Sequence, residues 1–402
     1  MAAQGFDIVI SGGGLSGCLM ALSLADLRHK DGSALSIAIV EANPVLKDAS
    51  KSFDDRVLAL SHGTAEYLKS VGVWPRLQDD AEAIETIHIS DRGHYGKARI
   101  QAYEHQVSAL GYVVEMSLIG KSLLTAIKPK KNIQWFAPDS IIEIEWCAGH
   151  VDIRLDSGAQ LRADLLLACD GGMSACRQFA NIGVNKREYG QSALIANVGT
   201  SRPHHNIAYE RFTETGPIAM LPLSGMKEGE GRCSLVWTLT PELAGQMNAL
   251  NDNEFKRELE QAFGRWLGDI TMVGKRDIYP LNLIQAQEQI YHRMALIGNA
   301  SHTIHPIAGQ GFNLGVRDVE QMAALIKQAL DASQDIGFFS LLNEYAEQRQ
   351  QDHNEVITLT DSLVTLFSNN LAPLVIGRNI GLKVLNYCSA LKNALVKKTM
   401  GY

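Results

Sequence analysis

The amino-acid sequence predicts an α/β fold in which a parallel-sheet domain, assembled from separated pieces of chain, carries an inserted antiparallel sheet. Near the N-terminus, "FDIVI", "GGGLSG" and "LSIAIVEA" have the order strand, glycine turn with helix, and strand, as in a right-handed βαβ unit. Between about 190 and 240, apolar and polar residues alternate through four segments, which is typical of antiparallel strands. A last buried strand, "MALIGNA", precedes a helical remainder and predicts that the first domain is completed only there.

Composition and charge describe an ordinary globular protein. The 402 residues are 46% hydrophobic and 20% charged, which predicts two domains. The net charge of -7 argues against a nucleic-acid-binding function. The sequence lacks both the pattern of a secretory leader and an apolar run of the roughly 18 residues that span a bilayer, so we expect a cytoplasmic location. Six cysteines without C-x-x-C or metal-ligand spacing predict mostly buried, reduced thiols.

The turn "GGGLSG" has the spacing of a dinucleotide-binding loop. Gly12, Gly14 and Gly17 stand in G-x-G-x-x-G register after a strand and before a helix. There they permit a tight turn, close approach of a pyrophosphate and close helix–strand packing. Glu41 ends the next strand, where its carboxylate can accept hydrogen bonds from ribose hydroxyls. The pattern predicts NAD or FAD and disfavours NADP, whose 2′-phosphate would be repelled; the alternative is a tight turn that binds nothing.

The hydrophobic periodicity of the remaining segments predicts further helices and strands and suggests how the chain divides into domains. Segment 141–170 predicts a hairpin that returns into a buried strand, Val57–Leu77 has a helical pattern, and 252–268 has that of an amphipathic helix. We assign the chain to three parts: a discontinuous nucleotide-binding domain (1–80, 100–182 and 280–335), a sheet domain (81–99 and 183–279) and a C-terminal helical segment (336–402).

Two further strand ends carry polar residues and glycines. "LLLACDGGMSACR" places Asp170 and Gly171 after a buried strand, with Arg177 shortly beyond; a turn, a cap or an ion pair is the alternative to a functional role. "IGNASHTIHPIAGQGFNLGVRD" (297–318) follows the last buried strand and contains four glycines. We expect it at the same edge of the sheet as the glycine turn.

Taken together, "GGGLSG", "DGGMSACR" and "GNASHTIHPIAGQGFNLGVRD" resemble the class A flavoprotein aromatic hydroxylases, the group related to p-hydroxybenzoate hydroxylase. The resemblance covers about residues 5–350. It implies a p-hydroxybenzoate-hydroxylase-like α/β fold, with a Rossmann-type FAD-binding domain, an inserted antiparallel-sheet substrate domain and C-terminal helices. Within the group, "HPIAGQGFNLGVRD" is similar to the hydroxylases of ubiquinone biosynthesis.

The resemblance implies an FAD-dependent monooxygenase. Such an enzyme takes electrons from NAD(P)H and inserts one oxygen atom of O2 into the ring of a polyprenylated phenol through a flavin C4a-hydroperoxide. The branch implied acts on 2-octaprenyl-6-methoxyphenol, with other ubiquinone-biosynthesis proteins as partners. Two alternatives remain open: a flavin-dependent prenyl-lipid reductase, and a flavin-bearing structural subunit of a biosynthetic complex.

The resemblance also assigns site residues. The glycine turn and Glu41 hold the ADP half of FAD, and Arg56 reaches the flavin side, with an ion pair to a neighbouring aspartate as its alternative. Asn299 stands where the family usually has aspartate beside the ribityl chain. The N–H groups of the helix that begins near Gly311 would stabilise negative charge on the reduced ring. The full cofactor set is Gly12, Gly14, Leu15, Ser16, Gly17, Glu41, Arg56, Asp170, Gly171, Asn299, Gly309, Gln310, Gly311 and Asn313, and the candidates beside the reacting ring are Pro306, Gly309 and Gly311.

Three features are weighed against simpler interpretations. His302 and His305 lack further ligands, so packing or a hydrogen bond is expected and a metal is not. The C-terminal segment 378–402 holds five basic residues and no acidic one; it predicts a helix packed on the body or, alternatively, a peripheral contact with anionic lipid at the inner face of the cell membrane. The substrate wall is expected on the inserted sheet, with ordinary core packing as the alternative for each candidate: Tyr209, Phe212, Met220, Pro222 and Trp237.

Overall fold

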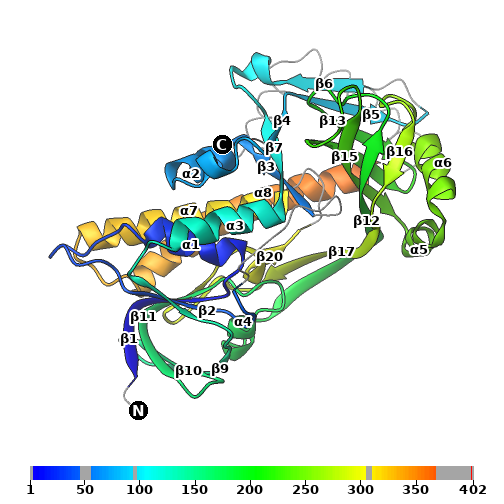
Figure 1. Ribbon diagram of the computed structural model, residues 1–402. Helices are drawn as coiled ribbons and strands as arrows, with labels where there is room; N and C mark the ends of the chain where they lie inside the picture. The colour runs from blue at the N-terminus through cyan, green and yellow to red at the C-terminus, as the bar shows by residue number, and fades with distance from the viewer. Residues whose placement is uncertain (1–2, 46–55, 94–96, 305–309, 368–399, 401–402) are drawn as a thin grey trace.

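A parallel sheet and an antiparallel sheet form the two halves of the protein, with helices between and outside them (Figure 1). The computed structural model describes residues 3–45, 56–93, 97–304, 310–367 and 400. Within these residues the architecture is mixed α/β, and the parallel sheet receives strands that precede and strands that follow the antiparallel sheet in the sequence.

The parallel sheet is built around the N-terminal strand. β1 (Gln4–Ser11) pairs in parallel with β2 (Ile37–Val40) on one side and β11 (Gln160–Ala168) on the other. The described sheet continues with β8 (Ile133–Phe136) beyond β2 and with β19 (Met294–Leu296) and β18 (Ile290–Tyr291) beyond β11. The hairpin predicted in 141–170 is present as β9 (Ile141–Trp146) and β10 (Val151–Leu155), which leads back into β11.

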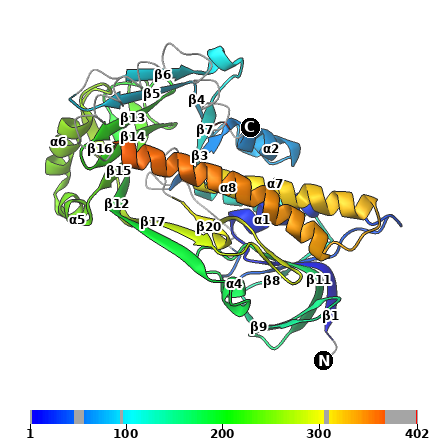
Figure 2. The same cartoon turned by 180° about the vertical axis from the view of Figure 1, so that it is seen from behind.

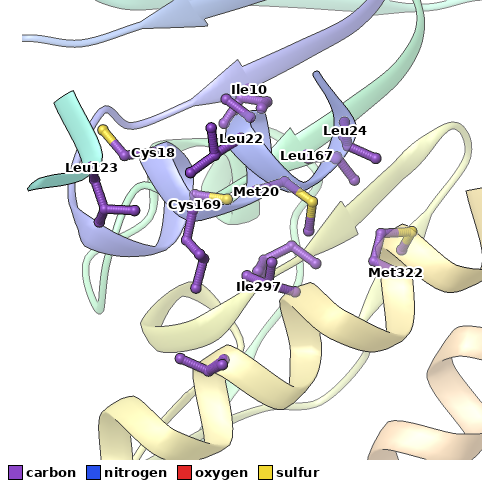
Figure 3. Packing of buried hydrophobic residues seen from close by; sticks show 14 of the residues in the cluster. Ile10, Cys18, Met20, Leu22, Leu24, Leu123, Leu167, Cys169, Ile297 and Met322 are labelled. Atoms are coloured by element: carbon purple, nitrogen blue, oxygen red, sulfur yellow. The ribbon is translucent and has the colours of Figure 1, made fainter. Parts of the chain in front are cut away.

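Helices cover the parallel sheet because its central strands are apolar on both faces, as in doubly covered α/β sheets. One face packs on α1 (Leu15–Leu24), α3 (Met116–Ile127) and α7 (Gln310–Asp331). Figure 3 shows this core, where Ile10 of β1, Leu167 of β11 and Ile297, the residue after β19, lie against Met20 of α1 and Met322 of α7. α8 (Phe339–Phe367) packs beside α7, and the short α4 (Ala175–Phe179) follows β11.

The antiparallel sheet lies at the far end of two long strands, β12 (Val184–Thr200) and β17 (Asp277–Ala286), which rise from the parallel-sheet half (Figures 1 and 2). Its described pairing order is β20-β17-β12-β15-β14-β13-β5-β6, and β16 pairs with β12. Every pairing is antiparallel except that of β13 with β5. The remaining bounds are β20 His302–Thr303, β15 Gly231–Leu239, β14 Gly216–Leu223, β13 Ile207–Thr213, β5 Thr86–Asp91, β6 Lys97–Gln101 and β16 Ile270–Val273.

Two helices cover only one face of the antiparallel sheet, which we call the outer face. These are α5 (Pro241–Ala249) and α6 (Asp252–Phe263), the predicted amphipathic helix. A capping box between Asn251 and Glu254 begins α6, and Gly264, in the left-handed region at φ +91°, ends it. We call the opposite side the inner face; it looks toward the rest of the molecule.

A small sheet of β3 (Val57–Ser61), β7 (Gly111–Glu115) and β4 (Glu82–Ile84) lies against the inner face. The helical prediction for Val57–Leu77 is wrong over Val57–Ser61, because this segment pairs antiparallel with β7, a partner about 50 residues away that local periodicity does not reveal. The helix α2 begins only at His62 and ends at Ser70. Short 3-10 turns follow at Trp74–Arg76 and Ala102–His105.

Buried thiols agree with the expectation from the cysteine pattern. Cys18, Cys169, Cys176 and Cys233 are buried and free, whereas Cys147 is half-exposed and Cys388 lies outside the described residues. Burial raises the pKa of Cys18 and of Cys233 to about 12. In the described part of the chain, no helix combines the length and apolar character needed to cross a membrane.

A buried ion pair joins the antiparallel sheet to the small sheet. Arg232 of β15 donates from Nη1 to Oε1 of Glu115 at the end of β7, at 2.9 Å, and both side chains are 9% exposed. Removing one partner of a buried pair leaves an unpaired charge in a poorly solvated place.

We therefore expect Glu115→Gln to lower the free energy of unfolding by about 3 kcal/mol. The double variant Glu115→Gln with Arg232→Met should recover most of that loss, because it buries no charge. Chemical denaturation at pH 7 measures both. Equal stability of the single variant and the wild type would contradict the assigned role of the pair.

Candidate functional site

The glycine turn after β1 is forced by close backbone contacts. Gly12 adopts φ +96°, and a Cβ on it would come within 2.6 Å of the Cys169 carbonyl oxygen. A Cβ on Gly17 would lie 1.9 Å from the Gly12 carbonyl oxygen. Both positions therefore require glycine for the turn to pass between β11 and α1, and this closeness brings the start of α1 to the edge of the sheet.

Gly14 differs from these two glycines because the space beside it is open. No described atom lies within 4 Å of a Cβ placed on Gly14. The residue is the N-cap of α1, without a side-chain cap and with no acidic residue in the first turn. The first N–H groups of a helix have no intrahelical acceptor, so those at Leu15 and Ser16 are oriented to receive an anion. The turn thus fits the pyrophosphate of a dinucleotide.

Glu41 follows β2 and stabilises the turn. Its Oε2 accepts the Gly13 N–H at 2.7 Å, and its Oε1 accepts the Asn43 N–H at 2.9 Å. The carboxylate is half-buried beside the turn, at the position where sequence analysis expects the adenosine ribose. Its contact with a ribose remains a prediction.

The second motif lies beside the first because β11 is the parallel neighbour of β1. Asp170 follows β11, and its Oδ2 accepts the Cys176 N–H at 3.1 Å. Its Oδ1 is buried and has no hydrogen-bond partner among the described residues, as expected for an atom that faces a bound group. Gly171 has φ +81°, a left-handed conformation that favours glycine.

Arg177 has the structural role that sequence analysis gave as its alternative. The side chain is buried, and its guanidinium donates to the carbonyl oxygens of Gly172 and Ala300, each at 2.8 Å. It therefore ties the loop after β11 to the loop after β19.

The third motif converges on the same edge. Gly298–Ala300 is a short 3-10 turn directly after β19, the parallel neighbour of β11. A Cβ on Gly298 would lie 3.0 Å from Ser16 Oγ, and one on Gly315 of α7 would lie 3.2 Å from Gly298 Cα. Asn299 is exposed beside these contacts. The prediction that the third segment lies at the edge of the glycine turn is therefore confirmed in its geometry.

The start of α7 carries the remaining predicted residues. Gln310 is buried and Gly311 is half-buried at the first turn of the helix. Asn313 bonds to the backbone of β3: its Oδ1 accepts the Ser61 N–H and its Nδ2 donates to the Ala59 carbonyl, both at 2.9 Å. This amide thus fixes β3 beside α7, and any contact with the flavin stays a prediction. Pro306, Gly309 and His305 lie outside the described residues.

Arg56 stands directly before β3. It is exposed, and its Nη1 lies 3.5 Å from the Tyr279 hydroxyl of β17. The aspartates proposed as its alternative partners, Asp54 and Asp55, are outside the described residues. Arg56 therefore bridges the cofactor side of the molecule and the inner face of the antiparallel sheet.

The predicted substrate residues divide between the two faces. Tyr209, Met220 and Trp237 belong to the core under α6, where they pack with Phe255 and Phe263. These three residues therefore have the ordinary core packing that the sequence left open as the alternative to a substrate contact. Pro222, two residues after Met220 on β14, is buried on the same outer face, whereas Phe212, 4% exposed, alternates to the inner face.

Sequence analysis did not identify the inner-face residues that lie between Phe212 and Arg56. They alternate with the candidates above, and the cross-strand register aligns them in one row: Ile195, Val236, Ala219, Glu210 and Ile89. The alternating pattern predicts two faces, but nothing local in the sequence says which face α6 covers.

A buried charge network holds the third motif. Asp318 of α7 accepts the Gly298 N–H at 2.9 Å through Oδ2, while its Oδ1 lies 2.7 Å from Arg349 Nε and 2.9 Å from His353 Nε2, both on α8. Burial by itself would raise the pKa of Asp318, but the neighbouring His353 and Arg349 outweigh it and hold this pKa well below the usual value.

His302 lies against this network. Its ring is stacked obliquely on that of His353, with centroids 4.3 Å apart, and its Nδ1 is 3.6 Å from Asp318 Oδ2. Burial lowers the pKa of His302 to about 3, so the ring is neutral at pH 7. The grouping of His302, Asp318 and His353 has the spacing of metal ligands. However, the Asp318 oxygens already accept donors, and Arg349 opposes a second positive charge. Packing therefore describes His302 better, and hydrogen bonding describes Asp318 and His353 better.

Comparison with known proteins decides the family. The model of the FAD binding domain family matches residues 6–360. A ubiquinone hydroxylase of Rhodospirillum rubrum is 33% identical over 400 residues, covering 98% of this chain and 89% of that protein. The chain belongs to the FAD-dependent aromatic hydroxylases. This result confirms the resemblance found in the sequence and identifies FAD as the cofactor.

Other members agree with the assignment. The 3-demethoxyubiquinol 3-hydroxylase of Escherichia coli is 31% identical and is covered completely, as is this chain. Among solved structures, p-nitrophenol 4-monooxygenase of Pseudomonas putida superposes with a TM-score of 0.79 at 18% identity, covering 99% of each chain. The predicted p-hydroxybenzoate-hydroxylase-like fold is therefore confirmed, and this chain is an FAD-dependent monooxygenase of the family.

Gly14 offers a test of the cofactor site that leaves the fold intact. Its extended backbone accepts alanine, and the new methyl group would meet no protein atom but would occupy the space open to the pyrophosphate. We expect Gly14→Ala to weaken FAD binding at least about tenfold, or about 1.4 kcal/mol. The apoprotein should keep its stability within about 0.5 kcal/mol. Flavin titration and melting curves measure the two effects.

Gly5→Ala is the matched control, because Gly5 also has open space around it but lies at the beginning of β1. Its affinity for FAD should match that of the wild type. Unchanged flavin affinity in Gly14→Ala would place the pyrophosphate elsewhere.

Asp318→Asn should destabilise the protein by about 3 kcal/mol at pH 7, because it removes the fully buried partner of Arg349 and leaves that charge with Asp352 alone. Because the pKa of Asp318 is lowered in the folded state, its ionised carboxylate stabilises the fold at pH values above the ordinary pKa of about 4. This stabilisation is lost as the pH falls through the folded-state pKa. The difference between wild type and variant should therefore shrink below about pH 4. Denaturation from pH 3 to 8 measures this, with the exposed Asp331→Asn on the same helix as control. A difference independent of pH would contradict the ionic role.

Proposed function

We propose that the enzyme hydroxylates the aromatic ring of a polyprenylated phenol, 2-octaprenyl-6-methoxyphenol, in ubiquinone biosynthesis, with NAD(P)H as electron donor and O2 as oxygen source. The observation that carries this proposal is the convergence of the three family motifs at one sheet edge, opposite an apolar inner face. The names of the relatives in Rhodospirillum rubrum and Escherichia coli support the substrate class.

FAD, when bound, supplies the oxygen-transfer chemistry. The protein therefore needs to position the substrate, polarise the reacting groups and exclude water. The N-terminal amides of α1 would hold the pyrophosphate of FAD. Asp170 and Asn299 would offer polar atoms to the part of FAD that links the pyrophosphate to the flavin ring. The N–H groups in the first turn of α7 would stabilise negative charge that the reduced cofactor carries near Gly311.

The inner face of the antiparallel sheet supplies an apolar surface for the phenol ring and its prenyl chain. Ile195, Val236 and Ala219 are half-buried there, unlike the fully packed residues of the outer face. Such a surface excludes water from the ring and orients it toward the cofactor side, which Arg56 reaches through Tyr279.

We further propose contact with other ubiquinone-biosynthesis proteins and a peripheral position at the inner face of the cell membrane. The basic segment 378–402 would make the membrane contact, because its charge suits anionic lipid and the polyprenyl substrate resides in lipid. The structure of residues 378–399 is outside the described part.

The substrate is tested by analysing lipids from a strain that lacks the protein. We expect 2-octaprenyl-6-methoxyphenol to accumulate, and we expect purified enzyme to incorporate one 18O atom from 18O2 into it when NADH or NADPH is supplied. An unchanged quinone pool would contradict the proposal. Oxidation of NAD(P)H without an oxygenated product would favour a prenyl-lipid reductase, and no reaction would favour a structural subunit.

A further inference from the structure

One carboxylate interrupts the apolar row on the inner face. The row crosses the sheet from β12 to β5 through direct register partners: Ile195 faces Val236, Val236 faces Ala219, and Glu210 lies between Ala219 and Ile89. Direct partners in a sheet point to the same side. Glu210 therefore shares a face with these four apolar side chains.

Three contacts establish where this face looks. Ala208, two residues before Glu210, packs with Ile84 and Val113 of the small sheet. Tyr279 is the register partner of Ala193, which lies two residues from Ile195 and so on the same face; its hydroxyl is the group near Arg56. The neighbours of Glu210 on β13 point the other way, since Tyr209 packs under α6. The row thus looks toward the cofactor side.

Within the described part of the chain, the Glu210 carboxylate has no structural partner. No hydrogen bond or ion pair engages it within the described residues. The side chain keeps some access to solvent, but the surrounding atoms exclude most water, and this burial raises the pKa of Glu210 to about 7. A carboxylate held this way costs stability without returning a contact, which is typical of groups kept for chemistry.

Charged groups on the neighbouring elements do not account for the raised pKa of Glu210. The elements packed around Glu210 carry Glu82 on β4, Asp91 on β5, Asp277 on β17, and the Glu115–Arg232 pair between β7 and β15. None of these charges contributes to the raised pKa of Glu210, for which burial alone is responsible. The group is therefore governed by its apolar surroundings and would respond strongly to a polar molecule placed against them.

We propose that Glu210 binds the hydroxyl group of the phenol substrate and accepts its proton during ring hydroxylation, an inference that rests on the proposed function. The phenol O–H bond breaks, its proton passes to the carboxylate, and its electron pair enters the ring, where a ring carbon bonds to oxygen. That carbon then loses its own hydrogen as a proton, which restores the aromatic ring, and Glu210 returns a proton to the phenol oxygen. The oxygen atom that bonds to the ring comes from O2, whose O–O bond breaks, and the other oxygen atom leaves as water with two electrons from the nicotinamide donor.

The first test is the pH dependence of the chemical step. With 2-methoxy-6-prenylphenol as short-chain probe, the wild-type rate of hydroxylation should rise with pH through about 7, because the base must be ionised. Glu210→Gln should lose about a hundredfold in that rate and lose the rise with pH. Glu214→Gln is the matched control, four residues along the chain in the exposed turn between β13 and β14. It should retain the wild-type rate and profile.

The second test measures binding without turnover. The probe and its methyl ether, which lacks the hydroxyl hydrogen, are titrated into oxidised holoenzyme and followed by flavin absorbance. Wild type should prefer the phenol about tenfold or more, and Glu210→Leu should remove that preference because leucine cannot accept a hydrogen bond. Equal preference in both proteins would overturn the proposal.

A third measurement needs neither substrate nor flavin. A carboxyl whose folded pKa is raised destabilises the fold as pH rises from its unfolded value of about 4.3 to about 7. Apoprotein with Glu210→Gln should therefore melt about 2 °C or more above wild type at pH 8, and the gap should narrow as the pH falls below about 7 and close below about pH 4. Glu214→Gln should show no such gap, and absence of the gap in Glu210→Gln would contradict the isolated state of the carboxylate.

These outcomes separate the inference from the proposed function. If wild type hydroxylates the probe while Glu210→Gln matches Glu214→Gln in rate and profile, the role of Glu210 is wrong and the proposed function stands. If wild type itself fails to hydroxylate both the probe and the octaprenyl substrate, the proposed function fails.

Discussion

The buried carboxylate of Asp318 is the interaction on which the arrangement of the site depends. It joins the backbone of Gly298 to α7, on which it stands, and to Arg349 and His353 of α8. A fully buried charge persists only where partners satisfy it, so these three segments can hardly move apart without exposing it or leaving it unpaired. The loop that carries Asn299 is thereby fixed to the helix whose first turn we propose to face the cofactor, and Arg177 ties the same loop to the Asp170 loop.

The two sheets have different roles: the parallel sheet positions the cofactor motifs, and the antiparallel sheet presents an apolar face. Parallel strands end at a common edge, which gathers the glycine turn, Asp170 and Asn299 into one site although more than 250 residues separate the first from the last. Within the described residues, α5 and α6 cover the outer face of the antiparallel sheet, whereas Ile195, Val236 and Ala219 on the inner face are only half-buried and are placed to contact a ligand. The buried pair of Glu115 and Arg232 fixes the distance between that face and the small sheet.

This division suits a reaction in which the cofactor performs the difficult bond formation. The described chain provides helix N-termini, an apolar surface and one isolated carboxylate on the two sides that face each other. A carboxyl of raised pKa in apolar surroundings, such as Glu210, is well suited to take a proton from a phenol, because neither a charge nor a hydrogen bond from the described residues competes for it.

The sequence by itself determined the family, the cofactor and the βαβ unit, because these depend on local spacing: Gly12, Gly14 and Gly17 must be glycines wherever a strand, a dinucleotide and a helix meet. Tertiary structure decided what local patterns leave open. Val57–Ser61 is a strand because β7 lies beside it, and Tyr209, Met220 and Trp237 are core because α6 covers their face. Period-two alternation specifies two faces equally well, and only the long-range packing of α6 determines that Glu210, not Tyr209, faces the cofactor side.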